Sequence, residues 1–311
     1  MEYVLGIDIG TSSVKTGLFD IHGNMLDLES YEYSINYPQP GWVEQNPEEW
    51  WEGMKRNVRA LLSRHNVRDK ILSLSLSTQG GVSIFLDENR QLLYPAISWF
   101  DTRAEEMVPL LSKDISLHEI YHLCGFPALG RLNFSIATWF RHKKPNIFNK
   151  CRYFASAVDY LNLKLTGEFA IDISNLAHNS FLDMNTGDYS KRIMEIAGIN
   201  AEQLPRIVSS GGVVGMLTSE ASVELGLNRN VKVISGGHDQ YCANIGVGAV
   251  NEGECVLSAG TAWALLATAE KPYFDDQFRV FPGIHIFEEK YGLMSAISAG
   301  GNSLSWFNNA F

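Results

Sequence analysis

A polar turn between two apolar strands opens the chain. Residues 3–20 contain Asp8 at the end of an apolar run, and the polar residues that follow it are Gly10, Thr11, Ser12, Ser13 and Lys15. Glycine lets the backbone approach an anion, hydroxyls and amides bind phosphate oxygens, and a carboxylate holds the accompanying Mg²⁺ directly or through water. The turn therefore predicts a phosphate site with Asp8 as the magnesium ligand, and an ordinary polar hairpin is the alternative interpretation.

The same design returns near the other end of the sequence. Residues 255–266 consist of an apolar strand, a turn with Gly260 and Thr261, and a second apolar strand. Ser258 stands where the first copy has Asp8, so the second turn keeps its anion-binding character without the carboxylate. Two such turns predict a duplicated fold whose halves hold a nucleotide between them.

Further motifs occur in a fixed order between the two turns. They lie at residues 40–51, 99–103, 159–161, 165–168, 204–205, 215–218, 226–227 and 236–240. Together with the turns, they make the sequence similar to the FGGY family of carbohydrate kinases, in the superfamily that contains actin and the heat-shock ATPases. The resemblance runs through nearly the whole chain.

The resemblance implies an α/β fold of actin-like, ribonuclease H-like domains, each with a mixed sheet and helices on both faces. Residues 1–245 are expected to form the N-terminal domain, with the sugar site, the first phosphate turn and the catalytic aspartate. Residues 246–311 would begin a similar domain that carries the second turn. Family members are longer, and their adenine-binding segment would lie beyond Phe311. The ligands implied are ATP, Mg²⁺ and a small sugar or polyol.

The composition limits the choice of partners. With 311 residues, 45% hydrophobic and 19% charged, the chain can form one large domain or two. A net charge of -10 argues against nonspecific nucleic-acid binding, for which a basic patch supplies the affinity. No apolar stretch approaches the roughly 18 residues of a membrane span, and no signal peptide is recognisable. A cytoplasmic protein without nucleic-acid or membrane partners is expected.

Strand and helix signals alternate in the first part of the chain. We expect three strands within residues 3–35, with a turn at 20–24, and further strands at 71–77 and 82–86. Asn46 is expected to cap a helix that begins at the following proline. The apolar face of this helix would consist of Trp50, Met54, Val58 and Leu61 or Leu62.

The middle of the chain favours helices, and a strand leads to the domain junction. Residues 104–230 are expected to be mostly helical, with an insertion around residues 172–187. An apolar strand over 231–235 should end at two glycines, and we place the junction near residue 245. The remaining residues would begin a second sheet.

Asp239 is the candidate catalytic base. A sugar hydroxyl is a poor nucleophile at neutral pH, so a kinase gains from a carboxylate that accepts its proton. Asp239 follows a strand and two glycines, which project a side chain into a cleft, and the resemblance places the family's catalytic base at this position. From the residues alone the alternative is a helix N-cap, since the chain from Gln240 onward is compatible with a helix.

Sugar recognition requires hydrogen-bonding side chains beside a flat apolar surface. Such side chains are offered by Gln79, Trp99, Asp101, Arg103 and Gln240. The resemblance implies that positions 79–81 and 99–103 line the sugar pocket, although a place in the core is the alternative for Trp99.

Three positions depart from the family pattern. Xylulose kinases typically have Met-His, and glycerol kinases Arg-Glu, where this chain has Gly80 and Gly81. The loss of two side chains predicts a roomier or differently polar pocket. Ile136 stands where the family commonly has a lysine, and we assign it no role.

Other motifs point to no second chemistry. His118 and His122 are spaced i, i+4, but no third ligand in a known motif accompanies them, so a solvated helix face is favoured over a metal site. Dinucleotide-binding and P-loop fingerprints are incomplete or missing. No C-x-x-C pair occurs, and the cysteines Cys124, Cys151, Cys242 and Cys255 are interpreted as reduced core thiols.

The sequence thus predicts a kinase that uses ATP and Mg²⁺ to phosphorylate a hydroxyl of a small sugar or polyol. Closeness to the xylulose-kinase-like branch favours a ketopentose such as xylulose, while Gly80 and Gly81 leave another pentulose, a polyol or a deoxy sugar open. The alternative is a non-catalytic sugar-binding remnant or sensor that lacks a complete nucleotide site. A homodimer is common among similar enzymes and is the expected assembly.

Overall fold

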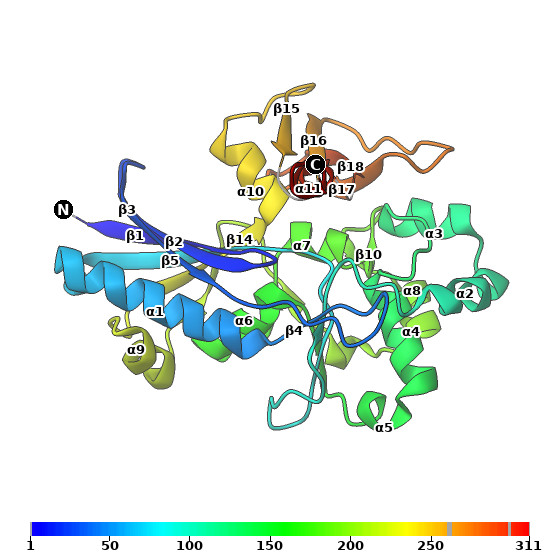
Figure 1. Ribbon diagram of the computed structural model, residues 1–311, viewed down its shortest axis with the longest axis horizontal. Helices are drawn as coiled ribbons and strands as arrows, with labels where there is room; N and C mark the ends of the chain where they lie inside the picture. Colours follow the sequence, from blue (N-terminus) through cyan, green and yellow to red (C-terminus); the bar gives the residue numbers. More distant parts are fainter. Residues whose placement is uncertain (1, 260–262, 298–299, 311) are drawn as a thin grey trace.

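Two sheets form the centre of the fold, as the computed structural model of the chain shows (Figure 1). The structure describes residues 2–259, 263–297 and 300–310. A six-stranded sheet has the order β13-β14-β5-β1-β2-β3, and a four-stranded sheet has the order β15-β16-β18-β17. The expected α/β class and the start of a second sheet are therefore confirmed.

The first sheet is mixed. β5 runs parallel to both β1 and β14, and the remaining neighbours are antiparallel. Its strands are β1 (Tyr3–Ile9), β2 (Ser13–Asp20), β3 (Met25–Glu32), β5 (Ile71–Thr78), β13 (Val213–Met216) and β14 (Lys232–His238). The three strands expected within residues 3–35 are present. In β1, fully buried residues alternate with half-buried ones. One face of the sheet is therefore covered more completely than the other at this strand.

Helix α1 (Pro47–His65) begins where the sequence predicts. The side chain of Asn46 accepts a hydrogen bond from the backbone N–H of Glu48, which satisfies one free donor of the first turn. The predicted apolar face, with Leu61 as its last member, is fully buried against β2 and β3. Local capping and a 3.6-residue apolar period are sufficient to fix this helix.

Helices cover both faces of the first sheet. In Figure 1, α1, α6 and α9 lie below it, whereas α10 and the second sheet lie above it. Between residues 104 and 230 the chain is mostly helical, as expected. The remaining helices are α2 (Val108–Asp114), α3 (Leu117–Cys124), α4 (Asn133–Lys143), α5 (Pro145–Phe148), α6 (Ala157–Thr166), α7 (Ile173–His178), α8 (Lys191–Ala197), α9 (Ser219–Leu225), α10 (Asp239–Gly246) and α11 (Gly300–Ala310).

Short two-stranded sheets and single turns of 3₁₀ helix connect the larger elements. The strand expected at 82–86 is shorter, because only its last three residues form a continuous strand, while Ser83 forms an isolated bridge with Ile97. The pairs are β4 (Glu44–Gln45) with β7 (Ala96–Ile97), β6 (Ile84–Leu86) with β8 (Tyr153–Ala155), β9 (Ala170–Ile171) with β12 (Arg206–Ile207), and β10 (Leu182–Asp183) with β11 (Asp188–Tyr189). The 3₁₀ helices are η1 (Arg68–Lys70), η2 (Glu105–Met107) and η3 (Ala201–Gln203).

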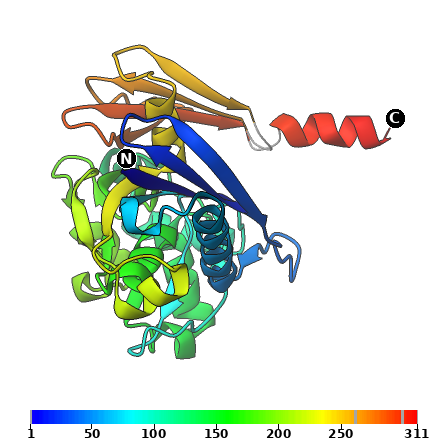
Figure 2. The same ribbon diagram turned by 90° about the vertical axis from the view of Figure 1, so that its left-hand side faces the viewer.

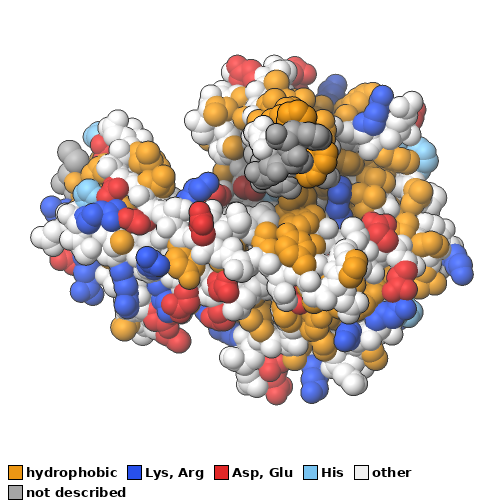
Figure 3. All heavy atoms as spheres, viewed as in Figure 1, with side chains coloured by type: hydrophobic (Ala, Val, Ile, Leu, Met, Phe, Trp, Pro, Cys, Tyr) orange, Lys and Arg blue, Asp and Glu red, His pale blue; other side chains and the backbone are white. Residues whose placement is uncertain are grey.

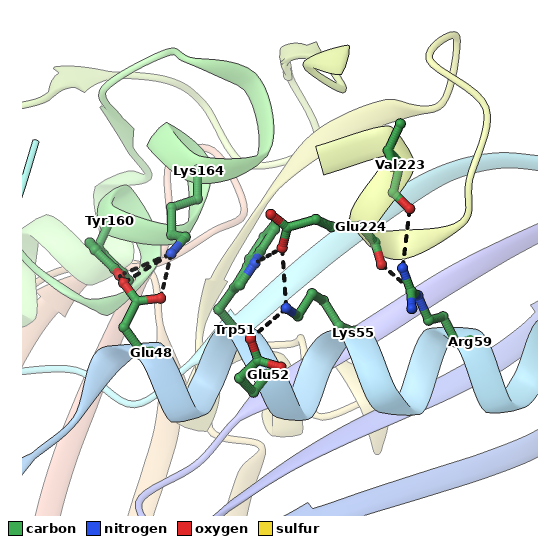
Figure 4. A network of polar contacts seen from close by, with 9 residues as sticks. All are labelled: Glu48, Trp51, Glu52, Lys55, Arg59, Tyr160, Lys164, Val223 and Glu224. Atoms are coloured by element: carbon green, nitrogen blue, oxygen red, sulfur yellow. Dashed lines mark hydrogen bonds and ion pairs between the residues drawn. The ribbon is translucent and has the colours of Figure 1, made fainter. Parts of the chain in front are cut away.

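Polar contacts fix α1 to the helices beside it (Figure 4). The carboxylate of Glu48 accepts from Tyr160 Oη at 2.6 Å and pairs with Lys164 at 2.7 Å, both on α6. Glu224 on α9 accepts from the indole N–H of Trp51 at 2.6 Å and pairs with Lys55 at 3.2 Å. This network holds the helical layer under the strands that lead to the candidate site.

The second sheet consists of antiparallel strands. They are β15 (Cys255–Ala259), β16 (Trp263–Ala269), β17 (Phe281–Ile284) and β18 (Tyr291–Ile297). Helix α11 projects beyond the end of this sheet (Figure 2), and exposed hydrophobic side chains gather on α11 and its neighbourhood (Figure 3). Within the described ranges, no helix combines the length and apolar character needed to cross a bilayer.

Helix α10 joins the two sheets. β14 continues through Gly236 and Gly237 to His238, so the strand is longer than the sequence predicted. A Cβ atom added at Gly283 or Gly292 would lie 2.6 Å from Tyr241 Oη, which shows that the Tyr241 ring rests directly on these two glycines of β17 and β18. The boundary between residues 245 and 246 stays a prediction.

Candidate active site

The first polar turn has its carbonyl oxygens directed toward protein donors. The oxygens of residues 10 and 13 both accept from Tyr33 Oη, the latter at 3.2 Å, and the oxygen of residue 12 accepts from the Tyr33 amide at 3.0 Å. The oxygen of Thr11 accepts from Gln45 Nε2 at 2.6 Å. Partial negative charges that would repel a phosphate are thereby neutralised. The side chains of Ser12 and Lys15 are exposed beside the turn.

Three predicted or neighbouring side chains connect this turn to the sugar-site residues. Trp99 Nε1 donates to Thr11 Oγ1 at 3.1 Å, and Trp99 is half-buried. Gln79 donates through Nε2 to Gln45 Oε1 at 3.1 Å, and its backbone N–H donates to the carbonyl of Ile9 at 2.8 Å. The predicted phosphate and sugar residues therefore form one continuous structure.

Asp8 lies near the end of β1, where its Oδ1 accepts from Ser77 Oγ at 2.7 Å. Burial raises the pKa of Asp8, and the charge of Asp239 adds to this effect. Carboxylate and hydroxyl oxygens are the ligands that Mg²⁺ prefers, and Mg²⁺ is commonly held by one or two carboxylates together with substrate phosphates and water. The described residues contain no cluster of three or more His, Cys, Asp or Glu able to hold a metal. The Asp8 carboxylate with the adjacent Ser77 hydroxyl fits a magnesium ion that is shared with a phosphate.

Asp239 is the first residue of α10 and follows directly on β14. The N-cap is His238, whose Nδ1 accepts from the Gln240 N–H at 3.3 Å, so the N-cap alternative for Asp239 is wrong. Nδ1 of His238 also lies 3.3 Å from Asp239 Oδ1. Burial raises the pKa of Asp239 to about 6, although its hydrogen bonds with Gln240 oppose the shift, and burial lowers the pKa of His238 to about 3. A carboxylate with such a pKa beside a neutral imidazole suits a general base.

The missing side chain at Gly80 does not leave an empty space in the site. A Cβ atom at Gly80 would lie 2.3 Å from His238 Cδ2 and 2.6 Å from His178 Cδ2. The centroids of these two imidazole rings are 4.1 Å apart. A roomier pocket is therefore wrong at position 80, because two histidines fill the volume that a side chain would take. A pocket of different polarity stays a prediction.

Asp101 and Arg103 lie in a buried ion cluster beneath the site. Arg103 Nη2 is 2.9 Å from both Asp101 Oδ2 and Glu44 Oε1, and the guanidinium carbon lies 4.0 Å from the ring centroid of Trp42. Asp101 Oδ2 also accepts from the Val43 N–H at 2.5 Å. The acceptor and donor groups of these two predicted sugar ligands are thus largely engaged with one another. Their position supports the segment that carries Trp99, and direct sugar contact by either stays a prediction.

Two amide side chains at the site have an unsatisfied acceptor. Gln79 Oε1 and Gln240 Oε1 are buried, and neither accepts a hydrogen bond from the described residues. A buried acceptor without a donor costs about 1–3 kcal/mol. Both residues were predicted as sugar ligands, and the hydroxyl groups of a sugar would supply the missing donors.

The sequence interpretation missed several residues of the site. The buried carboxylate of Asp172 accepts from Ser174 Oγ at 2.5 Å and from Asn175 Nδ2 at 2.6 Å, and Ser174 Oγ in turn accepts from the His238 N–H at 2.9 Å. His178 follows on the same helix, α7. The cluster Asp172-Ile-Ser-Asn inside an apolar stretch could have indicated this role. An insertion around residues 172–187 stays a prediction, but the beginning of that segment is part of the site.

Other predictions fall outside the site or need correction. Gly260 and Thr261 lie outside the described residues. Cys124 and Cys151 are buried free thiols, as expected, whereas Cys242 is only half-buried and Cys255 is exposed at the start of β15. His118 and His122 are exposed on α3, where their rings lie 4.9 and 4.4 Å from those of Phe278 and Phe274.

The chain is similar to known carbohydrate kinases. Residues 3–246 match the model of the FGGY family of carbohydrate kinases, N-terminal domain. Xylulose kinase of Escherichia coli is 29% identical over 306 residues, which cover 97% of this chain and 62% of that protein. Gluconokinase of Bacillus subtilis is 27% identical over 311 residues, which cover 100% of this chain and 60% of that protein.

A solved structure extends the agreement to the fold. The ligand-bound xylulose kinase from Lactobacillus acidophilus superimposes with a TM-score of 0.93 at 25% identity, over 98% of this chain and 62% of that one. The mixed sheet, with Asp8 on β1 and Asp239 directly after β14 on either side of β5, gives the chain the actin-like fold class. The chain belongs to the FGGY family of carbohydrate kinases, and it spans about three fifths of the length of these relatives.

Proposed function

We propose that the full-length protein is a kinase that transfers a phosphoryl group from ATP to a hydroxyl of a small sugar or polyol. Asp239 accepts the proton of the attacking hydroxyl. The turn from Gly10 to Ser13, with Lys15, holds phosphate oxygens, and Asp8 would hold Mg²⁺. When bound, the metal neutralises charge on the phosphates. Gln79, Trp99 and Gln240 bind and orient the sugar.

The observation that carries this proposal is the convergence of Asp8 and Asp239 on one edge of the sheet. Both β1 and β14 run parallel to β5, and Ser77 of β5 pairs with Asp8 on one side and with Gly237 on the other. The two carboxylates thus lie on either side of one strand end, which supports the proposed roles of Asp8 in binding magnesium and of Asp239 in accepting a proton. Phosphoryl transfer requires this combination of charge neutralisation and nucleophile positioning.

The substrate expected from the sequence is a ketopentose such as xylulose, which the xylulose kinases among the relatives support. A sugar acid is the second candidate. Gluconokinases also occur among the relatives. In addition, Arg131, which has no ion-pair partner among the described residues, lies close enough to His178 for its charge to lower the pKa of that residue. The test is ADP release by the full-length protein with ATP, Mg²⁺ and a panel of ketopentoses, polyols, hexoses and sugar acids. Sugar-dependent turnover that Asp239→Asn abolishes would support the kinase, whereas turnover retained in this variant would reject Asp239 as the base.

Two further points belong to the proposal. A cytoplasmic location is proposed because ATP and a phosphorylated sugar are metabolites of that compartment. A homodimer is proposed from the resemblance, and light scattering of the full-length protein measures it directly. The non-catalytic alternative predicts sugar binding by calorimetry without ATP consumption.

A further inference from the structure

The segment between α3 and α4 carries an arginine to the sugar-site residues. Asn133 Nδ2 donates to the carbonyl of Val82 at 2.8 Å, which fixes the start of α4 beside the residue that follows Gly81. Phe126 packs against His178 with ring centroids 5.2 Å apart. Arg131 lies between these two anchor points, and its positive charge acts on His178.

The guanidinium of Arg131 has no partner in the described part of the chain. Among the described residues, no carboxylate lies within 4.0 Å of this guanidinium, and none provides a hydrogen-bond acceptor for its N–H groups. The charge of Glu105 reaches it without forming an ion pair, while Glu105 Oε1 accepts instead from the Gly130 N–H at 3.1 Å. Arg131 is half-buried, and burial lowers its pKa. A partly desolvated cation that makes no direct ion pair is stabilised when an anion binds to it.

The surroundings of Arg131 leave the role of counter-ion to a ligand. His178 is neutral at physiological pH, because burial lowers its pKa well below the usual value, and the charges of His238 and Arg131 lower it further. The two histidines therefore do not compete with Arg131 for an anion, and their ring nitrogens can bind hydroxyls. Asp239 lies beyond His238, at 3.3 Å from its ring nitrogen. The order Arg131, His178, His238, Asp239 thus places a cation and a base at opposite ends of a pair of neutral rings.

We propose that Arg131 binds the carboxylate of the substrate and that the substrate is a polyhydroxy acid whose hydroxyl groups contact the histidine pair. This inference rests on the proposed kinase function and names its substrate class. A guanidinium binds a carboxylate through two parallel hydrogen bonds, which gives orientation as well as affinity. Orientation from this end would bring a hydroxyl remote from the carboxylate toward Asp239.

The matched substrates for the test are D-gluconate and D-glucitol. They carry the same hydroxyl pattern at carbons 2 to 6, and they differ at carbon 1 in a carboxylate against a neutral CH₂OH group. D-Xylulose is the third substrate. We compare ATP turnover and calorimetric binding of the full-length wild type with those of three variants. These are Arg131→Gln, Arg131→Lys and the control Arg229→Gln, which replaces an exposed arginine between α9 and β14.

We expect the wild type to prefer gluconate over both neutral compounds. Arg131→Gln should lower kcat/KM for gluconate by at least about 30-fold, through KM, because one partner of a buried charge pair is lost. The loss for glucitol, which has no carboxylate, should be far smaller than the loss for gluconate. Arg131→Lys should retain part of the preference, and Arg229→Gln all of it.

Two results of the turnover assay would overturn the inference. One is a wild type that turns over xylulose or glucitol as well as gluconate, and another is an Arg131→Gln variant that loses all substrates equally. If no sugar supports ATP turnover, the kinase proposal fails separately. Calorimetry then decides the inference: gluconate binding that Arg131→Gln abolishes supports it, and the absence of gluconate binding to the wild type rejects it.

Discussion

Trp99 Nε1 donates a hydrogen bond to Thr11 Oγ1, with 3.1 Å between the two atoms, and so connects the two ends of the proposed reaction. Thr11 belongs to the phosphate turn, and Trp99 belongs to the segment predicted to line the sugar pocket. A change at either residue should therefore be detected at the other. This connection leads to the first of the following predictions.

Replacing the indole of Trp99 should loosen the phosphate turn without removing the aromatic surface. We expect Trp99→Phe to raise KM for ATP about 3- to 10-fold, since a buried hydrogen bond contributes about 0.5–1.5 kcal/mol. Thr11→Val should have a similar effect. The double variant should cost little more than either single one in steady-state kinetics, and full additivity would contradict the coupling.

A methyl group at position 80 should displace the histidine pair. Gly80→Ala puts a Cβ 2.3 Å from His238 and 2.6 Å from His178, so we expect a loss of about 1–3 kcal/mol in the free energy of unfolding. Gly246→Ala, where nothing lies within 4 Å, is the control. Thermal melts in sodium gluconate should show weakened ligand stabilisation for the first variant alone.

The rate should follow the protonation of Asp239. Since burial raises its pKa to about 6, kcat/KM should be constant above about pH 7 and fall about tenfold per pH unit well below pH 6. Asp239→Asn should lower kcat by about 10²–10⁴-fold and remove this limb from the residual activity. A pH–rate profile with the same limb in Asp239→Asn would assign it to another group.

The same carboxylate should reduce stability when it is ionised. Its folded pKa of about 6 exceeds the usual value of 3.8, so between these pH values the folded chain binds more protons than the unfolded one. The contribution of Asp239 to stability therefore falls as the pH rises from about 4 to about 6. We expect Asp239→Asn to raise the free energy of unfolding on the order of 1 kcal/mol at pH 7.5 and to have no such effect at pH 4. Urea titrations at both pH values, without Mg²⁺, measure this difference.

The buried cluster around Arg103 should matter for stability more than for recognition. Glu44→Gln leaves the Asp101 pair in place and should be mild, whereas Asp101→Asn weakens the counter-charge of a buried guanidinium and should cost about 3–5 kcal/mol. A urea titration gives these values. If Asp101→Asn folds with unchanged stability and a higher KM for the sugar, direct substrate contact is the better explanation.

The sequence predicts those parts of the fold in which residues adjacent in the chain determine the local structure. Asn46 and Pro47 define the start of α1 because the cap and the first helical position are adjacent in the chain. The strands around residues 10–13 follow from a local contrast of apolar and polar residues. The base position was predicted from the glycines before Asp239 and from the resemblance, although its cap is His238.

The missed parts depend on contacts between distant segments. His178 reaches the site because the absent side chain at Gly80 leaves room for it, and no local pattern links these two positions. Tyr33 supports the phosphate turn from the position directly after β3, and a single tyrosine at the end of a strand carries no signal of such a role. Arg131 is similarly inconspicuous in the sequence. Its unpaired charge becomes apparent only when the surrounding elements are placed.

The ring of Tyr241 on Gly283 and Gly292 restricts how such proteins can be recombined. A chimera that takes residues 1–245 from one relative and the rest from another would combine this ring with a foreign surface. Where that surface has a side chain in place of either glycine, α10 must shift, and Asp239 at its first turn must shift with it. Crossovers placed before β14 or after β18 would keep the ring and its glycines in one fragment. Shuffled libraries cut at those two points should therefore contain more active members than libraries cut at the domain boundary.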